Sequence, residues 1–306
     1  MDARRKKSVC QEDRWDRGLW TLDPAGILSG RWYCISLELV MKTKLVIVGA
    51  AGRMGGRIIA LATETGDFDI VGAVDIDGHP ELGKDAGILA GVGPLSVELS
   101  DTFPKEAVDV VIDFSLPEAV GRTLEYCTQK SVALVSGTTG LGPEQRELFK
   151  TASTTIPVIY GTNMSVGMNV LFSLVGKAAA MLGEEYDIEI IEQHHRFKKD
   201  APSGSALTLA ENICEATGRN IDTALTHGRS GKDALRKKGD IGMHAVRAGD
   251  ITGVHSVIYG SQGETVTLGH TANNRDTFVR GALRAAKWLA GKKPGLYSMA
   301  DVLGIE

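Results

Sequence analysis

Short apolar, β-branched runs alternate with helical segments from Met41 onward, and this alternation constrains the fold more than any other feature. The first unit is an apolar run at 44–48, a glycine-rich turn at 49–55 and a helical pattern at 57–65. Further strands are expected at 70–74, 108–114, 132–135 and 157–160, and further helices at 117–129 and 143–152. Strands that alternate with helices of this length form right-handed βαβ units, in which helices cover both faces of a parallel sheet. Residues 41–166 are therefore predicted to form an α/β domain with a Rossmann-type, doubly wound parallel sheet, the architecture that binds dinucleotides.

The pattern changes at Gly167, where a helical apolar stripe leads to a strand at 187–192 and then to a histidine-rich loop. Three further β-like runs follow at 241–247, 253–259 and 265–270. Turn residues separate these runs, which predicts an antiparallel meander within an open mixed sheet, and open edges favour subunit pairing. We expect residues 167–274 to form an α+β domain for substrate binding and oligomerisation. The segment from about 275 to 306 contains a helix at 276–290 that could pack back on either domain, and we assign it to the first.

Composition narrows the class of protein. Of the 306 residues, 43% are hydrophobic and 24% are charged, which is ordinary for a globular chain. The formal net charge of −4 gives no basic field, so nucleic acid is not expected as a partner. Four scattered cysteines favour a reducing compartment and no metal site, and no apolar run is long enough to span a membrane. We expect a cytoplasmic protein without a membrane partner.

Residues 1–40 differ from the rest of the chain. They include a basic cluster at 4–7 and show neither a helical nor a strand period, whereas a clear strand starts soon after Met41. The segment lacks the apolar core of a secretory signal, and its acidic residues disfavour a transit peptide. We interpret it as an atypical, disordered extension upstream of a natural start at Met41.

The glycine-rich turn after the first strand has the spacing GxxGxxG. Gly49 permits a tight turn, Gly52 lets the backbone approach a pyrophosphate, and Gly55 allows close packing of the helix whose N-terminal dipole faces the phosphates. Glycine turns of this kind also occur for packing alone. Asp75 favours the cofactor interpretation, because it ends the second strand, where an acid hydrogen-bonds a ribose diol.

Two later turns follow neighbouring strands of the predicted sheet. One comprises Gly137, Thr138, Thr139 and Gly140, and the other comprises Gly161, Thr162, Asn163 and Met164. Ligands of open α/β sheets bind at the carboxyl ends of the strands, so the backbone of both turns is expected to hold the nicotinamide end of the same cofactor. Each turn taken alone is also typical of an ordinary loop.

Residues 192–205 combine two imidazoles, three cationic side chains and a Ser-Gly-Ser turn within fourteen residues. His194 and Lys198 lie four residues apart, and both can be protonated beside an anionic substrate. The backbone amides of Gly204 and Ser205 open a helix and complete an anion pocket. The segment therefore indicates a site where a small acidic substrate receives protons. The structural alternative is a basic loop on a solvated face, with a histidine in the core and Lys198 at the surface.

Several motifs together resemble one known family. They are the GxxGRMG turn at 49–55, Asp-Phe-Ser at 113–115, Gly-Thr-Thr-Gly at 137–140, the segment 163–169, the segment 192–204 and Val-Arg-Ala-Gly-Asp at 246–250. The chain from about Lys44 to its C-terminus resembles the 4-hydroxy-tetrahydrodipicolinate reductase (dihydrodipicolinate reductase) family of lysine synthesis through diaminopimelate. The resemblance implies NAD(P)H-dependent reduction of a cyclic dicarboxylate imine precursor, with loss of water, to tetrahydrodipicolinate. It also implies a homotetramer formed through the sheet of the second domain.

The resemblance implies a role for each matching residue. His194 resembles the family's acid/base residue and Lys198 its proton donor. Substrate carboxylates would be bound by His195, Ser203, Gly204 and Ser205. The cofactor contacts would be Gly49, Ala50, Ala51, Gly52, Arg53, Met54, Asp75, Gly137, Thr138, Thr139, Gly161, Thr162, Asn163 and Met164.

One departure from the family bears on cofactor choice. Many relatives carry an arginine just after the ribose-binding acid, where it can pair with a 2′-phosphate, but Ile76 and Asp77 stand here. This favours NADH over NADPH, although Arg53 could still reach the phosphate.

Two alternative functions remain open at this point. One is a redox sensor that kept the fold and lost turnover, which the intact His194 and Lys198 disfavour. The other is a dehydrogenase of another small acid, such as a semialdehyde. That chemistry needs a reactive thiolate, and Cys127 and Cys214 both fall in expected helices without a neighbouring histidine.

Overall fold

The computed structural model describes residues 21–22, 28–29 and 42–305. In the N-terminal part it describes only a short antiparallel pair, β1 (Thr21–Leu22) and β2 (Leu28–Ser29). The remainder of residues 1–40, for which a disordered extension is predicted, lies outside the described residues.

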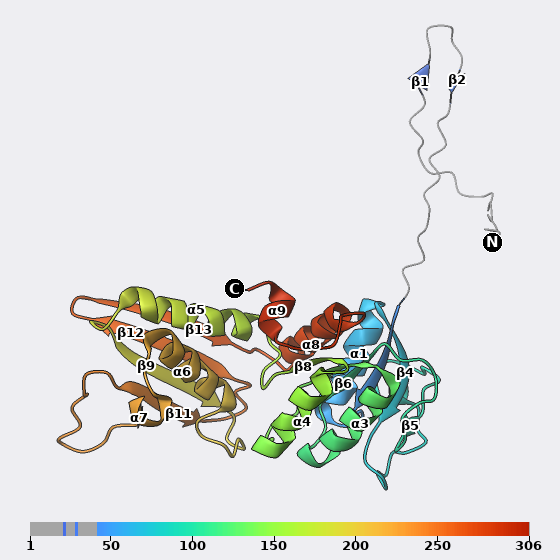
Figure 1. Ribbon diagram of the computed structural model, residues 1–306, viewed down its shortest axis with the longest axis horizontal. Coiled ribbons are helices and arrows are strands. Elements are labelled where there is room, and N and C mark those ends of the chain that lie inside the picture. Colours follow the sequence, from blue (N-terminus) through green and yellow to red (C-terminus); the bar gives the residue numbers. More distant parts are fainter. Residues whose placement is uncertain (1–20, 23–27, 30–41, 306) are drawn as a thin grey trace. The chain divides into compact units, whose positions relative to one another are not determined.

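A seven-stranded, wholly parallel sheet is formed by strands within residues 43–160 and by one strand near the C-terminus (Figure 1). Its strands are β3 (Thr43–Val48), β4 (Phe68–Val74), β5 (Leu99–Ser100), β6 (Val110–Asp113), β7 (Ala133–Ser136), β8 (Pro157–Tyr160) and β14 (Gly295–Tyr297). They lie in the order β14-β8-β7-β6-β3-β4-β5. The order reverses at β3, so the sheet has a topological switch point between β3 and β6, where such sheets bind ligands. The predicted doubly wound architecture is confirmed.

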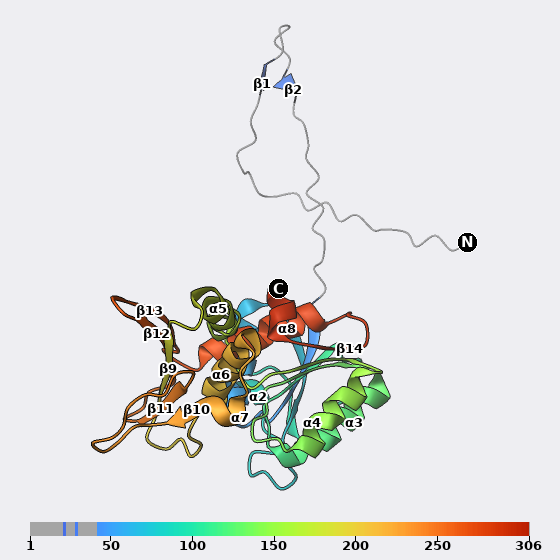
Figure 2. The ribbon, with the colours of Figure 1, turned by 60° about the vertical axis from the view of Figure 1, so that its left-hand side comes forward.

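Helices cover both faces of this sheet, because successive side chains of its strands point to opposite sides. Leu45 and Ile47 of β3 pack into one core with α1 (Arg53–Thr65) and α8 (Asp276–Leu289). Val46 and Val48 pack into the other core with α3 (Val120–Lys130) and α4 (Pro143–Ser153), and Figure 2 shows these two helices on one side of the strands. This part of the chain also contains three short helical elements: α2 (Ala86–Ala90), the 3-10 turn Pro117–Ala119 and α9 (Met299–Leu303). Helix α8, from the C-terminal segment, thus lies on the first sheet.

A mixed five-stranded sheet is formed by strands within residues 187–271. Its strands are β9 (Asp187–His194), β10 (Leu225–His227), β11 (Ile241–Arg247), β12 (Val254–Ser261) and β13 (Glu264–Thr271), in the order β10-β11-β9-β12-β13. Its core lies beneath α5 (Val166–Leu182), α6 (Gly204–Thr217) and α7 (Ile221–Ala224). Figure 2 shows these helices on one face of the sheet.

The predicted antiparallel meander of the last three strands is wrong in one pairing. β12 and β13 do form an antiparallel hairpin, but β11 pairs with β9 in parallel, and β9 lies between β11 and β12. The sequence pattern marks where strands begin and end, whereas the partner of β11 depends on a crossover through α6 and α7. The correct pairing matters for the site, because it gives β9 a neighbour on each side.

Candidate active site

Two positions of the turn after β3 are packed too tightly for any residue but glycine. Gly49 has a φ of +75°, and a Cβ there would lie 2.9 Å from the carbonyl oxygen of Phe114. A Cβ on Gly55 would lie 2.1 Å from the carbonyl oxygen of Gly49, so the first turn of α1 sits directly against the loop. Gly52 is the N-cap of α1 and offers no side-chain cap, so the first amides of the helix, those of Arg53 and Met54, can bind an anion. The cradle fits the pyrophosphate of a dinucleotide.

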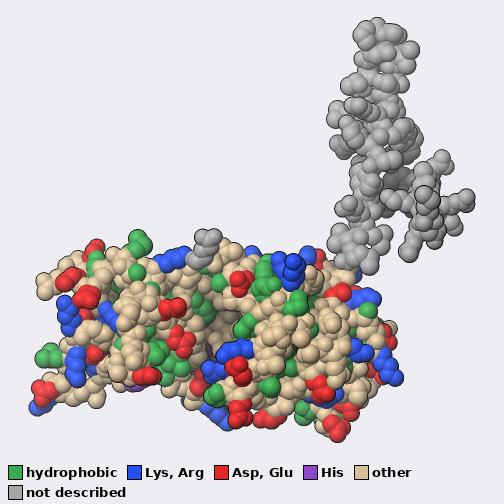
Figure 3. Space-filling view, viewed as in Figure 1, with side chains coloured by type: hydrophobic (Ala, Val, Ile, Leu, Met, Phe, Trp, Pro, Cys, Tyr) green, Lys and Arg blue, Asp and Glu red, His purple; other side chains and the backbone are tan. Residues whose placement is uncertain are grey.

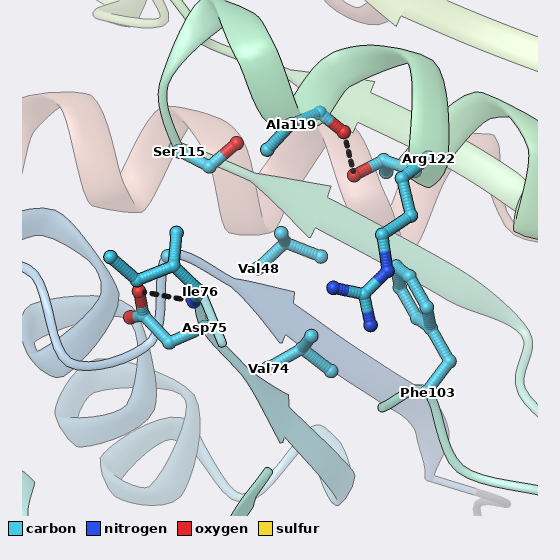
Figure 4. A pocket seen from close by; sticks show the side chains of 10 residues that line it. Val48, Val74, Asp75, Ile76, Phe103, Ser115, Ala119 and Arg122 are labelled. Atoms are coloured by element: carbon cyan, nitrogen blue, oxygen red, sulfur yellow. Dashed lines mark hydrogen bonds between the residues drawn. The ribbon is translucent and has the colours of Figure 1, made fainter. Parts of the chain in front are cut away.

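Asp75 is tied to this turn at the end of β4. Its Oδ2 accepts a hydrogen bond of 2.9 Å from the amide of Ala51, and its Oδ1 accepts one of 2.9 Å from the amide of Ile76. Each oxygen keeps a second lone pair for a ribose hydroxyl. Gly49 and Asp75 line one pocket at the switch point, shown in Figure 4. Phe103 and Arg122 also line this pocket, and no feature of the sequence singled them out.

The turn at 137–140 is held by a buried acid at the end of β6. Asp113 is 1% exposed and accepts hydrogen bonds from the amide and hydroxyl of Ser115, at 2.8 and 2.5 Å, and from the hydroxyl of Thr138 at 3.3 Å. Burial raises the pKa of Asp113 above its ordinary value, although these hydrogen bonds oppose the rise. The Thr138 side chain is buried and its hydroxyl already has a hydrogen-bond partner, whereas Thr139 is exposed at the carboxyl end of β7. Gly137 backs onto the Phe114 ring, 2.4 Å from where its Cβ would stand.

The turn at 161–164 connects the two groups of predicted site residues. The amide nitrogen of the Asn163 side chain donates to the Ser205 hydroxyl at 2.9 Å, and its oxygen accepts from the amide of Ser165 at 2.9 Å. A Cβ on Gly204 would lie 4.0 Å from the Cβ of Thr162. The structure thus brings the end of β8 beside the first turn of α6. Met164 is 1% exposed and packs in the core, so its side chain is not available to a ligand.

His194 is held at the end of β9 by a buried carboxylate. Its Nδ1 lies 2.5 Å from Oε2 of Glu192, which is 0% exposed. Both terminal nitrogens of Arg247, on β11, donate to Glu192 at 2.8 Å, and the amide of Ser203 donates to it at 3.0 Å. A carboxylate only accepts, so Nδ1 carries the hydrogen and Nε2 of the neutral ring keeps a lone pair.

Burial and hydrogen bonding set the protonation states of His194 and Glu192. Burial lowers the pKa of His194, and the nearby carboxylate of Glu192 opposes the shift without reversing it. Burial raises the pKa of Glu192, but the hydrogen bonds from Arg247 and His194 outweigh it, and the pKa is lowered overall. The result is an ionised Glu192 and a His194 ring that is mainly neutral at pH 7.

His255 completes the cluster from β12. It is 3% exposed, its ring lies 5.2 Å from that of His194, and its Nε2 is 3.2 Å from the Ser203 hydroxyl. Burial, followed by the proximity of His194, lowers the pKa of His255 to about 4, so the ring is neutral at pH 7. Sequence reasoning missed His255, because a histidine inside a strand carries no signal of its own. Arg247 was quoted within a motif, but its partner was not predicted.

The remaining residues of the loop take distinct places. Lys198 Nζ lies 2.9 Å from Asp200 Oδ2, and its side chain is 23% exposed. Ser203 is the N-cap of α6 and is buried, so its hydroxyl serves the helix amide of Ala206 and His255. Nδ1 of His195 is buried without a hydrogen-bond partner among the described residues, which marks a polar atom that a ligand can satisfy.

This arrangement can bind an anion beside groups that deliver protons. The amides that begin α6, the Lys198 ammonium and the partnerless His195 nitrogen supply positive potential and donors. Figure 3 shows a hollow near the middle of the molecule in this view, with Lys and Arg side chains at its margin.

Three further features of the described residues concern metal ligands, long apolar helices and cysteines. Within the part of the chain that the structure describes, no three His, Cys, Asp or Glu side chains are grouped to hold a metal ion, and no helix is long and apolar enough to cross a membrane. The cysteines at 127 and 214 are buried, and burial raises the pKa of both thiols. A thiolate mechanism through either of them is therefore disfavoured.

Comparisons with known proteins identify relatives over nearly the whole of residues 43–303. The family model for the dihydrodipicolinate reductase N-terminus matches residues 43–164, and the model for its C-terminus matches residues 167–303. The chain is 46% identical to the 4-hydroxy-tetrahydrodipicolinate reductase of Geotalea daltonii over 265 residues, 86% of this chain and 99% of the relative. It is 47% identical to that of Anaeromyxobacter dehalogenans over 265 residues, 86% of this chain and 98% of the relative.

Solved structures share the fold at lower identity. Dipicolinate-bound dihydrodipicolinate reductase from Paenisporosarcina sp. TG-14 superposes with a TM-score of 0.60 at 22% identity, over 85% of this chain and 99% of that one. An amine dehydrogenase from Mycobacterium smegmatis gives 0.57 at 14% identity, over 85% and 95%. The family models and the close relatives, which span nearly all of the chain from β3 onward, show that the protein belongs to the dihydrodipicolinate reductase family.

Proposed function

We propose that the protein reduces 4-hydroxy-tetrahydrodipicolinate to tetrahydrodipicolinate, with loss of water, in diaminopimelate and lysine biosynthesis. A pyridine nucleotide is its cofactor. The observation that carries the proposal is the buried Glu192 and His194 pair beside Lys198 and the first turn of α6, in contact with the cofactor turn through Asn163 and Ser205. That a relative was solved with dipicolinate, a cyclic dicarboxylate, supports the same class of ligand here.

The overall reaction consumes one hydride and one proton and releases one water. The reduced nicotinamide, when bound, supplies the hydride. His195 and the amides of Gly204 and Ser205 bind the substrate carboxylates, with the Ser205 hydroxyl fixed by Asn163. Lys198 donates the proton, and His194 exchanges protons through Nε2 while Glu192 holds its other nitrogen. Ser203 contributes by capping α6 and orienting Glu192 rather than by direct contact with substrate.

Of the two pyridine nucleotides, NADH is the cofactor that we propose. Asp75 is placed for a ribose diol, and its charge together with that of Asp77 opposes a 2′-phosphate. Ile76 offers no cation at the position that follows the acid. The other proposed contacts are those of the three turns: residues 49–54, 137–139 and 161–164.

We also propose a division of labour within the chain and a homotetramer in the cytoplasm. Residues 41–166, with 275–306, form the cofactor domain, and residues 167–274 form the domain for substrate and tetramerisation. Two separate hydrophobic cores flank the first sheet and one lies under the second, which supports the division. β13 is an edge strand whose side chains alternate between exposed and half-buried, and such an edge favours pairing with another subunit.

The test is NADH oxidation by purified protein, with substrate generated from pyruvate and aspartate semialdehyde by the partner synthase. Oxidation that depends on the synthase and is lost in His194→Ala and Lys198→Ala supports the reductase. If folded wild-type protein binds NADH but oxidises neither NADH nor NADPH, the result would favour the sensor function and refute the proposal.

A further inference from the structure

The pocket at the switch point has a wall that the proposed cofactor contacts do not use. Arg122, on α3, lines it together with Phe103, and Asp75 lines it at the other end. In Figure 4 the side chains of Val48 and Val74 lie between Asp75 and Arg122. The pocket therefore has an acid at one end, an apolar floor and a planar cation at the other end.

The Arg122 guanidinium is held in place, although the residue is exposed. One terminal nitrogen donates to the backbone oxygen of Asp101, and the central carbon lies 5.5 Å from the centroid of the Phe103 ring. Phe103 is itself stacked on Tyr126, with centroids 4.1 Å apart and planes at 11°. A free surface arginine samples many rotamers, whereas this one is supported by a carbonyl and by a two-ring stack. Its position is thus prepared before any ligand binds.

The shape and chemistry of the pocket select its occupant. A ribose on Asp75 places the attached base over the floor formed by Val48 and Val74 and toward Arg122. A flat, electron-rich base gains from contact with a guanidinium plane, and an apolar floor accepts its other face. We infer that Arg122, supported by Phe103, stacks against the adenine ring of the dinucleotide. This inference rests on the proposed function, because it presumes a pyridine dinucleotide in the pocket.

The same layout separates this role from recognition of a 2′-phosphate. A phosphate on the ribose would lie near Asp75, whereas Arg122 lies across the floor from it. Arg122 therefore strengthens the binding of NADH and of NADPH to a similar extent. The residue that follows Asp75, in contrast, discriminates between NADH and NADPH.

The test measures the Kd of NADH, NADPH and ADP-ribose by calorimetry, independently of turnover. Arg122→Ala should weaken all three by a similar factor, roughly three- to thirtyfold, which is the range of a cation–π or stacking contact. Arg122→Lys keeps the charge but loses the plane, and it should recover little of the affinity. Phe103→Leu should give a smaller loss in the same direction. Lys130→Ala, at the exposed end of the same helix, is the matched control and should bind as wild type does.

Three results would overturn the inference, and they are distinguishable. Loss confined to NADPH, restored by Arg122→Lys, would assign Arg122 to a 2′-phosphate. Unchanged affinity for all three ligands in Arg122→Ala, with wild-type thermal stability, would leave it without a role in binding. Wild-type protein that binds neither NADH nor ADP-ribose would refute the proposed function itself, whatever the variants do.

Discussion

Glu192 and His194 share one face of β9, with Oε2 of the carboxylate 2.5 Å from Nδ1 of the imidazole. Arg247 lies opposite His194 on β11, and His255 lies opposite Glu192 on β12. A strand alternates its side chains, so residues two apart point the same way, and the neighbours on both sides complete the group. The buried carboxylate thereby fixes the ring and compensates the charge of Arg247.

Glu192→Gln should lower kcat about tenfold or more, because second-layer partners of a catalytic histidine commonly contribute on this scale. Removal of the carboxylate also removes the interaction that opposes the burial effect, so the pKa of His194 should fall further and the pH profile of kcat/KM should shift to lower pH.

Glu189→Gln is the matched control for this change. Glu189 lies on the same strand and likewise binds arginine and histidine side chains, namely Arg229, Arg236 and His244, but it contacts none of the site residues through these bonds. Its kinetic pH profile should match that of wild type. Identical profiles for Glu192→Gln and wild type would show that the carboxylate does not position His194.

Lys198→Ala should reduce kcat by roughly 10²- to 10⁴-fold, the range for loss of a general acid, while the Kd for NADH stays unchanged. The ammonium pairs with Asp200 in the substrate loop, and Lys198 is not among the proposed cofactor contacts. Lys199→Ala removes an exposed cation from the next position and should retain near-normal turnover. Equal turnover of Lys198→Ala and wild type would eliminate the proton-donor assignment.

Burial of His255 makes stability depend on pH in a defined direction. Its pKa is lowered to about 4 in the folded protein from 6.5, so between these values the unfolded chain binds a proton that the folded protein does not. Stability is then fully present above about pH 6.5 and decreases as the pH falls. From pH 7.5 to pH 5 this one group should cost about 2 kcal/mol of unfolding free energy.

Urea unfolding at pH 7.5 and pH 5 measures this contribution. The pH-dependent loss of stability should be smaller in His255→Gln than in wild type, even if the variant is less stable at both pH values. His227→Gln replaces an exposed histidine and should leave the wild-type difference intact. If His255→Gln loses as much stability on acidification as wild type does, another group must bind the proton.

The sequence was sufficient for the first sheet because its information is local. β-branched runs, glycine turns and helices of sufficient length alternate, and the right-handed crossover rule then leaves little freedom. The glycine cradle and Asp75 could be predicted together, since the carboxyl ends of adjacent parallel strands meet at one edge.

Non-local pairing could not be predicted in the same way. β11 was expected beside β12, whereas β9 separates them, and that separation brings Arg247 and His255 to opposite sides of the Glu192 and His194 pair. The pocket wall was missed for the same reason. Phe103 lies in a loop and Arg122 on a helix, and neither has a spacing that relates it to Asp75.

Ile76→Arg should shift the protein toward NADPH. The side chain of Ile76 is 51% exposed and directly follows Asp75, so an arginine there can reach a 2′-phosphate and form a charge-assisted bond. A bond of this kind is worth about 1.5–3 kcal/mol, which corresponds to roughly a ten- to hundredfold gain in NADPH affinity relative to NADH, reduced by the nearby charge of Asp77. Ile88→Arg adds the same charge at a side chain of similar exposure, 58%, outside the pocket lining, and should leave the ratio of the two Kd values unchanged. A wild-type protein that already prefers NADPH, with no gain from Ile76→Arg, would show that the position after Asp75 does not set the choice and would overturn the proposed preference for NADH.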